Sequence, residues 1–285
     1  MKRRKVRVGT KKKIIAGMLL VLLAAVSVVA FNDEMVLKYY SIPTDKVEQD
    51  IRIALITDLH SCYYGKDQKL LIDAVRQEQP DIILLGGDIA DDKIPHDNTK
   101  TVIEALGPEY PCFYVSGNHE YWSGEIEEIK QLFRGAGIQV LEGEGSLLAF
   151  GEISIAIYGV DDPDGGKSAF SDQLNRAGSD VDQTIFNVLL SHRPEYIETY
   201  RNYPFDLVLS GHAHGGQWRI PGILNGLLAP DQGLFPKYAG GIYPSEHQIM
   251  IVSRGLAKES TRVPRIFNHR ELVIIDITAE TTKEP

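Results

Sequence analysis

The sequence predicts an α/β fold, in which short buried strands alternate with amphipathic helices. The apolar runs at 51–57, 82–85 and 112–116 contain few polar residues, as strands buried on both faces do. Five runs of this kind end on a residue that can bind a metal ion. Because open α/β sheets bind ligands at the carboxyl ends of their strands, these five ends predict one shared metal site.

The elements follow from the same patterns, taken in chain order. We expect strands at 36–42, 51–57, 82–85, 112–116, 139–141, 146–150, 153–160, 186–191, 207–210, 248–253 and 272–277. The first should be an edge strand that ends at Pro43. We expect helices at 99–106, 123–134, 168–177 and 195–200. We also expect a helix after the second strand, with Leu70, Leu71, Ala74 and Val75 on one face. The Gly- and Pro-rich segment 215–245 predicts a long ordered loop, and the tail from Thr278 should fray.

The N-terminal residues predict a membrane anchor. Eight of the first 13 residues are Lys or Arg and none is acidic, and residues 14–31 then contain neither a charge nor a proline. As a helix these 18 residues would span roughly 27 Å, close to the thickness of the hydrocarbon core. The basic segment 1–13 should stay in the cytoplasm, so the domain at 32–285 would lie outside the cytoplasmic membrane on a single-pass helix. The alternative is a signal peptide cleaved near Ala30, which would leave a secreted protein.

Composition limits the partners of the body. The net charge is −9, and without the first 13 residues the chain holds 22 basic and 39 acidic residues. Such an acidic body argues against binding nucleic acid or an anionic bilayer through a basic face. Cys62 and Cys112 are the only cysteines, too few for a disulfide framework, and we expect two buried or half-buried thiols.

The residues at the five strand ends are carboxylate, amide and imidazole groups. The runs stop at Asp58, Asp88, Asn118, His192 and His212, and within two residues of these stand further histidines, His60, His119 and His214. Oxygen and imidazole ligands without thiolate suit Mn²⁺, Fe or Zn²⁺ better than a structural zinc site. Each motif alone also has a structural interpretation, such as a helix cap or a packing turn. Their shared position at strand ends favours the metal site.

Together these motifs resemble the calcineurin-like metallophosphoesterase superfamily. The resemblance rests on Asp-x-His, Gly-Asp-x-x-Asp, Gly-Asn-His-Glu, a strand-end His and Gly-His-x-His, and it covers about residues 36–277. The segments 211–217 and 253–256 are similar to the bacterial membrane-associated branch that includes YkuE and YaeI. The resemblance implies a four-layer α/β/β/α sandwich, with a two-metal site between two mixed sheets.

The resemblance also implies roles for individual residues. One metal ion would be held by Asp58, His60 and His214, and the other by Asn118, His192 and His212. Asp88 would bridge the two ions. His119 would be the catalytic group that faces the substrate, and Asp91 would support a ligand from behind. The chain departs from the pattern of Ser/Thr protein phosphatases, because the Gly-Asp motif lacks their following arginine. This argues against phosphoproteins as substrates.

The implied reaction is hydrolysis of a phosphodiester or pyrophosphate by in-line attack of a hydroxide that bridges two metal ions. His119 would give a proton to the leaving oxygen. A site outside the membrane favours a lipid- or envelope-linked substrate. The alternatives are a phosphomonoesterase, a hydrolase of the UDP-2,3-diacylglucosamine type, whose substrate is cytosolic, or a non-catalytic metal-binding scaffold. Apolar residues of the 218–243 segment could meet acyl chains or could simply cover the sheet edge.

Overall fold

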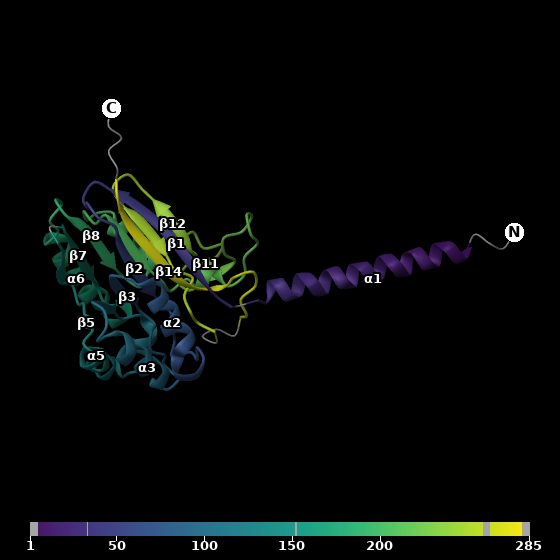
Figure 1. Cartoon of the computed structure of the whole chain (residues 1–285), viewed down its shortest axis with the longest axis horizontal. Helices are drawn as coiled ribbons and strands as arrows, with labels where there is room; N and C mark the ends of the chain where they lie inside the picture. Colours follow the sequence, from purple (N-terminus) through teal and green to yellow (C-terminus); the bar gives the residue numbers. More distant parts are fainter. Residues whose placement is uncertain (1–4, 33, 152, 259–262, 281–285) are drawn as a thin grey trace, which may run out of the picture.

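The computed structural model, which describes residues 5–32, 34–151, 153–258 and 263–280, has four layers (Figure 1). Two six-stranded sheets pack face to face, and helices cover the outer face of each sheet. The predicted α/β/β/α sandwich with two mixed sheets is therefore confirmed.

The first sheet has the strand order β1-β14-β2-β3-β4-β5. Its strands are β1 (Met35–Thr44), β14 (Arg270–Ala279), β2 (Ile51–Ile56), β3 (Ile82–Gly86), β4 (Cys112–Val115) and β5 (Gln139–Val140). Strands β2 to β5 are parallel, whereas β14 runs antiparallel to β2 and parallel to β1. The outer face is covered by α2 (Lys69–Glu78), α3 (Asp97–Leu106) and α5 (Ile126–Gly135), which share one apolar core with it.

The second sheet has the order β12-β13-β9-β8-β7-β6. Its strands are β12 (Gly241–Pro244), β13 (Ile249–Val252), β9 (Leu207–Ser210), β8 (Phe186–Leu190), β7 (Ile153–Gly159) and β6 (Gly145–Phe150). Strands β13, β9, β8 and β7 are parallel, and antiparallel partners flank them on both sides. The outer face packs on α6 (Lys167–Ser179) and α7 (Ile197–Tyr200).

The inner faces of the two sheets form a dry core of aliphatic side chains. Ile53 and Leu84 of the first sheet belong to the same buried cluster as Val188 and Leu209 of the second. Because these strands also pack against helices on their outer faces, both faces of each strand are apolar. This double burial explains why the strands appear in the sequence as continuous apolar runs.

The N-terminal helix α1 (Lys5–Ala30) projects from this body (Figure 1). It begins earlier than the 14–31 prediction, because the helix continues through the basic residues. Its stretch Lys12–Ala30 is 19 residues long with a mean hydropathy of 2.5, which is long and apolar enough to cross a membrane. Three basic residues of the predicted cytoplasmic segment, Lys2, Arg3 and Arg4, lie outside the described residues.

Several predicted boundaries need correction. The helix expected at 123–134 is α5, but it starts later, at Ile126, because Gly124 has a φ of 76° and ends the preceding turn. The short helix α4 (Asn118–Trp122) before it was not predicted. Leu70 is exposed on α2, and Ile72 is buried instead. Strand β1 continues through Pro43, which an edge strand allows. The last strand pairs with β1 as far as Ala279, so the tail does not fray at Thr278, and residues 281–285 lie outside the described residues.

The remaining elements are short. The segment expected to be a loop holds the hairpin of β10 (Leu228–Ala229) and β11 (Gly233–Leu234), and then β12. Single 3₁₀ turns occur at η1 (Lys66–Gln68), η2 (Pro163–Gly165), η3 (Pro194–Tyr196) and η4 (His214–Gly216). Cys62 and Cys112 are both buried and are not joined by a disulfide.

Candidate metal centre

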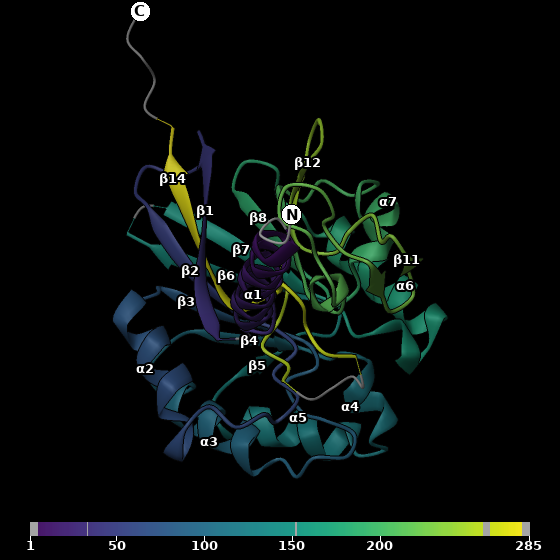
Figure 2. The same cartoon turned by 90° about the vertical axis from the view of Figure 1, so that its right-hand side faces the viewer.

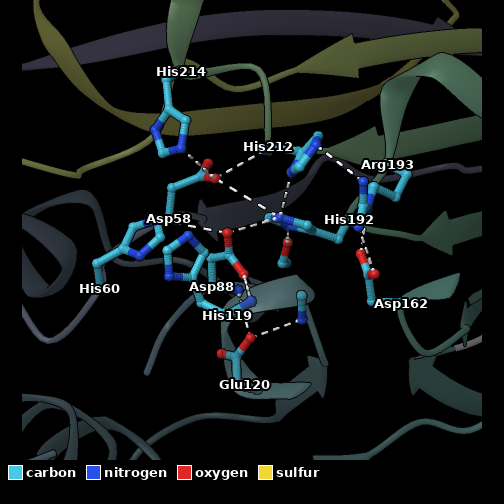
Figure 3. A network of polar contacts seen from close by, with 12 residues as sticks. Asp58, His60, Asp88, His119, Glu120, Asp162, His192, Arg193, His212 and His214 are labelled. Atoms are coloured by element: carbon cyan, nitrogen blue, oxygen red, sulfur yellow. Dashed lines mark hydrogen bonds and ion pairs between the residues drawn. The ribbon is translucent and has the colours of Figure 1, made fainter. Parts of the chain in front are cut away.

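The predicted ligands meet where strands of both sheets end (Figure 3). Asp58 follows β2 and Asp88 follows β3, while Asn118, three residues after the end of β4, begins α4. His192 and His212 come after β8 and β9 in the opposite sheet. All of these side chains are buried.

The ligand atoms form two groups that share one carboxylate. The first group contains Asp58, His60, Asp88 and His214, whose ligand atoms all lie within 4.8 Å of one another. The second group, defined by the same distance, contains Asp88, His192 and His212. The shared Oδ2 atom of Asp88 lies 3.6 Å from His60 Nε2 and 3.1 Å from His192 Nε2. In the second group, His212 Nδ1 lies 3.2 Å from His192 Nε2.

Several of these buried atoms have no hydrogen-bond partner among the residues that the structure describes. They are Asp58 Oδ2, His60 Nε2, Asp88 Oδ2, Asn118 Oδ1 and His214 Nδ1. Buried polar atoms are ordinarily paired, and an unpaired group costs about 1–3 kcal/mol. Five unpaired oxygen and nitrogen atoms in one place fit a metal cation, because a cation accepts their lone pairs. The donor set of carboxylate, amide and imidazole is therefore suited to divalent cations.

The charges around the site also fit cations. Burial lowers the pKa of His212 to about 4, so its ring is neutral, as a metal ligand must be. Burial opposes the positive charge of His192 as well, but the carboxylates of Asp88 and Asp58 outweigh it and raise the pKa of His192 to about 10. The carboxylates at the centre thus favour a positive charge between them.

The ends of the strands turn sharply to bring these side chains together. Asp58, His60, Asp88, His212 and His214 all adopt left-handed backbone conformations, with φ between 46° and 66°. Such conformations are costly for residues other than glycine and cluster at functional sites. Glycines allow the close approach: a Cβ on Gly87 would lie 2.6 Å from His192 Nδ1.

Glu120 fixes the backbone on one side of the centre. Its buried carboxylate accepts hydrogen bonds from the amides of Asp88, Ile89, Ala90 and Gly117 at 2.7–3.0 Å. Burial and the charge of Asp88 raise the pKa of Glu120 to about 7, while the amides favour its ionised form. Because it ties the loop after β3 to the loop after β4, Glu120 sets the distance between two candidate ligands.

His119 stands beside the centre and is not part of either ligand group around Asp88. Its Nδ1 atom lies 2.7 Å from Asp92 Oδ1 and 3.5 Å from Asp91 Oδ2, and its ring packs edge-on against His60 at 4.3 Å. Burial opposes protonation, but the hydrogen bonds and charges of the nearby aspartates raise the pKa of His119 to about 9. Asp91 also contacts His60 Nδ1 at 3.1 Å, which leaves Nε2 to face the centre.

A second network, which the sequence patterns did not reveal, lies behind His212. Asp231 Oδ2 is 2.9 Å from His212 Nε2 and also accepts a hydrogen bond from Arg193. The Arg193 guanidinium is buried and pairs with both oxygens of Asp162, at 2.6 and 2.9 Å. Arg193 could have been found from the sequence, because it directly follows a strand-end histidine. No motif around Asp231 marks it as part of the site.

The model of the family "Calcineurin-like phosphoesterase" matches residues 51–216, which include every candidate ligand of both groups. The chain belongs to this family. It is 32% identical over 250 residues to an "Uncharacterized metallophosphoesterase" of Aquifex aeolicus, covering 84% of this chain and 90% of that protein. Longer relatives exist, and the chain spans as little as 47% of one of them.

Two further comparisons agree with the family. The chain is 27% identical to "Phosphodiesterase YaeI" of Escherichia coli, over 72% of this chain and 74% of YaeI, which confirms the predicted resemblance to its branch. The solved structure of the NAD nucleotidase NadN of Haemophilus influenzae is similar in fold, with a TM-score of 0.50 and 14% identity over 73% of this chain and 46% of NadN.

This calcineurin-like phosphoesterase is thus a metal-dependent hydrolase of phosphoric esters. The family uses pairs of divalent metal ions, and the clustered ligand residues are consistent with such a pair.

Proposed function

We propose that this protein hydrolyses a phosphodiester or pyrophosphate at the outer surface of the cytoplasmic membrane. The observation that carries the proposal is the pair of buried ligand groups that share Asp88. Asp58, His60 and His214 would hold one cation, while His192, His212 and the amide of Asn118 would hold the other. Asp88 would contact both.

When bound there, two divalent cations supply positive charge for the phosphoryl oxygens and lower the pKa of a water molecule so that it can attack. The protein's own residues provide the arrangement. Asp91 holds the His60 ring by Nδ1, and Asp231 holds the His212 ring by Nε2, so that the opposite nitrogens face the centre. Glu120 keeps the backbone of Asp88 in place.

His119 would act on the leaving group. It is only partly buried, and Asp91 and Asp92 orient its ring through Nδ1. A proton on its ring can pass to the leaving oxygen as the ester bond breaks, a role worth typically 10²–10⁴-fold in rate.

The location and the substrate class follow from α1. A helix that can span the membrane, with eight basic residues before residue 14, favours a body outside the cytoplasm. A phosphoester in a lipid or another envelope component would then be within reach. The name of YaeI, a phosphodiesterase, supports a diester rather than a monoester.

The test compares two leaving groups on the full chain, purified with Mn²⁺. We expect turnover of bis(4-nitrophenyl) phosphate well above that of 4-nitrophenyl phosphate. His119→Ala should lose about 10²-fold or more on an alkyl diester, where the leaving oxygen needs a proton, and much less on the nitrophenyl diester. His247→Ala, which changes an exposed histidine far from the centre, is the matched control.

Three results would contradict parts of this proposal. Equal losses on both leaving groups would reject the proton-donor role of His119. A faster reaction with the monoester would identify a phosphomonoesterase. Binding of two cations without turnover of either ester would indicate a scaffold. Separately, Asp88→Asn should contain less bound metal than the unchanged chain, as measured by elemental analysis.

A further inference from the structure

The end of α1 lies at the same edge of the body as the candidate metal centre. Phe267 N donates to Ala30 O, the last residue of the helix, at 2.7 Å, and the neighbouring Asn268 donates from Nδ2 to His214 O at 2.8 Å. The topology agrees, because β1 starts beside the start of β14, and β14 runs antiparallel to β2, which ends just before Asp58. The metal centre and the end of α1 therefore lie at the same end of the sandwich.

Exposed apolar side chains surround this side of the molecule. They are 40–84% exposed and belong to the segment around β10 and β11: Trp218, Ile220, Ile223, Leu228, Leu234 and Phe235, which we call the apolar rim. Figure 2 looks onto this face, with α1 pointing towards the viewer and β11 on the same side of the body.

Hydrogen bonds join the apolar rim to both the helix and the centre. Trp218 pairs with Ile266, which precedes the contact of Phe267 with α1, and its Nε1 donates to Pro264 O at 3.0 Å. On the other side, Phe235 N donates to Leu227 O, and Leu227 N donates to Gly216 O, two residues after His214. Short series of hydrogen bonds thus connect the rim to both the end of α1 and the loop that carries His214.

Covering the sheet edge does not explain these side chains. The segment does cover that edge, but with other residues, since Ala229 and Tyr238 are buried against the second sheet. The rim residues point outwards and expose apolar surface to water, which is unfavourable by about 25 cal/mol per Å². A contiguous exposed apolar surface usually marks a binding site for another apolar surface.

The local charge also differs from that of the whole chain. Residues 215–270 contain seven Lys/Arg and three Asp/Glu, although the net charge of the chain is −9. This local excess sets the segment apart from the acidic remainder, for which the sequence predicts no binding to anionic bilayers. Among the described basic residues of this segment, Lys237 and Lys258 are exposed, whereas Arg270 is buried. Exposed lysines near apolar side chains are typical of surfaces that lie in the lipid headgroup region.

We infer that the apolar rim inserts into the bilayer that α1 spans, and that it holds the metal centre at the level of the lipid headgroups. This inference rests on the proposed membrane anchoring and phosphoester hydrolysis. Apolar faces of this kind enter the headgroup boundary to a depth of about 5–10 Å. A phosphoester in the headgroup of a membrane lipid would then enter the site from the bilayer, without leaving its acyl chains exposed to water.

The first experiment measures insertion. The full chain carrying Ile223→Cys, labelled with an environment-sensitive dye, is placed in phosphatidylcholine–phosphatidylglycerol vesicles with and without doxyl-labelled lipid. We expect a blue-shifted emission that doxyl lipid quenches by about half or more, for a dye within the depth given above. The control is Glu246→Cys, because Glu246 is exposed in the turn before β13, at the edge opposite His212.

Dye at residue 223 that stays in water, like dye at 246, would overturn the inference. A blue shift without quenching would also overturn it, because it would show that another protein covers the rim. The unchanged chain, treated with the same dye, gives the background from the two buried cysteines.

The second experiment compares a 4-nitrophenyl phosphodiester of diacylglycerol, carried in the same vesicles, with soluble bis(4-nitrophenyl) phosphate. The double variant Ile223→Ser/Phe235→Ser should lose about tenfold in rate on the vesicle substrate, since two apolar contacts with lipid are removed. Its rate on the soluble ester should not change. Equal vesicle rates would reject the rim. If the unchanged chain hydrolysed neither ester, the proposed function would fail, and the quenching result would still decide whether the rim inserts.

Discussion

His212 is held in one orientation by a residue from a distant loop. Asp231 contacts its Nε2, so the Nδ1 atom faces His192 and the centre. A carboxylate behind a metal-binding histidine fixes the ring and its tautomer. The Asp231 side chain is about half exposed, with 54% of its surface accessible, so it can be changed without disturbing the core.

Asp231→Asn should therefore weaken metal binding without unfolding the protein. An amide in this position can offer its NH₂ group to His212 in place of an acceptor, and we expect the affinity for the second cation to fall about 10–100-fold. Calorimetric titration of the metal-free full chain with Mn²⁺ measures this affinity.

Asp164→Asn is the matched control for this prediction. Asp164 also contacts Arg193, at 3.1 Å, but it does not touch His212. Its substitution should leave both metal affinities unchanged. Equal losses of metal affinity in the two variants would show that Arg193, and not Asp231, positions the His212 ring.

At the scale of the elements, the strands and their ends were the predictable part of the structure. Runs such as 82–85 are apolar on both faces, and each ends on a side chain that a buried strand could not hold in its interior. The helix expected at 123–134 exists as α5, but its start was predicted three residues too early, because the left-handed conformation of Gly124 interrupts the chain there. Asp231 could not be found because its role depends on how a long loop folds back over the centre, which no local pattern specifies.

One helix end offers a clean test of backbone strain. Gln79 caps α2 in a left-handed conformation, with a φ of 49°, and its side chain is exposed. Glycine adopts this conformation without the steric cost of a Cβ, so Gln79→Gly should stabilise the protein by about 0.5–1 kcal/mol. The melting temperature of the full chain in detergent reports the change.

The control is Gln77→Gly, two residues earlier and also exposed, but inside α2. Glycine in a helix lowers stability by about 0.8–1 kcal/mol relative to alanine, so this variant should melt at a lower temperature. Destabilisation of similar size by both substitutions would show that the end of α2 does not need the left-handed conformation.

At the scale of the whole molecule, the charges around α1 predict how the chain is oriented. Residues 1–13 hold eight basic residues, whereas residues 32–50 on the other side of the helix hold two basic and five acidic residues. Short basic segments stay on the cytoplasmic side of a membrane. The body, the apolar rim and the metal centre should then share the outer surface.

Cysteine labelling in intact cells tests this orientation. Glu246→Cys lies on an exposed turn of the body and should react with a maleimide that cannot cross the membrane, because the body lies outside. Lys5→Cys, at the start of α1, should react only after the cells are permeabilised. The reverse pattern would place the metal centre in the cytoplasm and would favour a cytosolic substrate. A body released into the medium without residues 1–30 would instead identify the segment as a cleaved signal peptide.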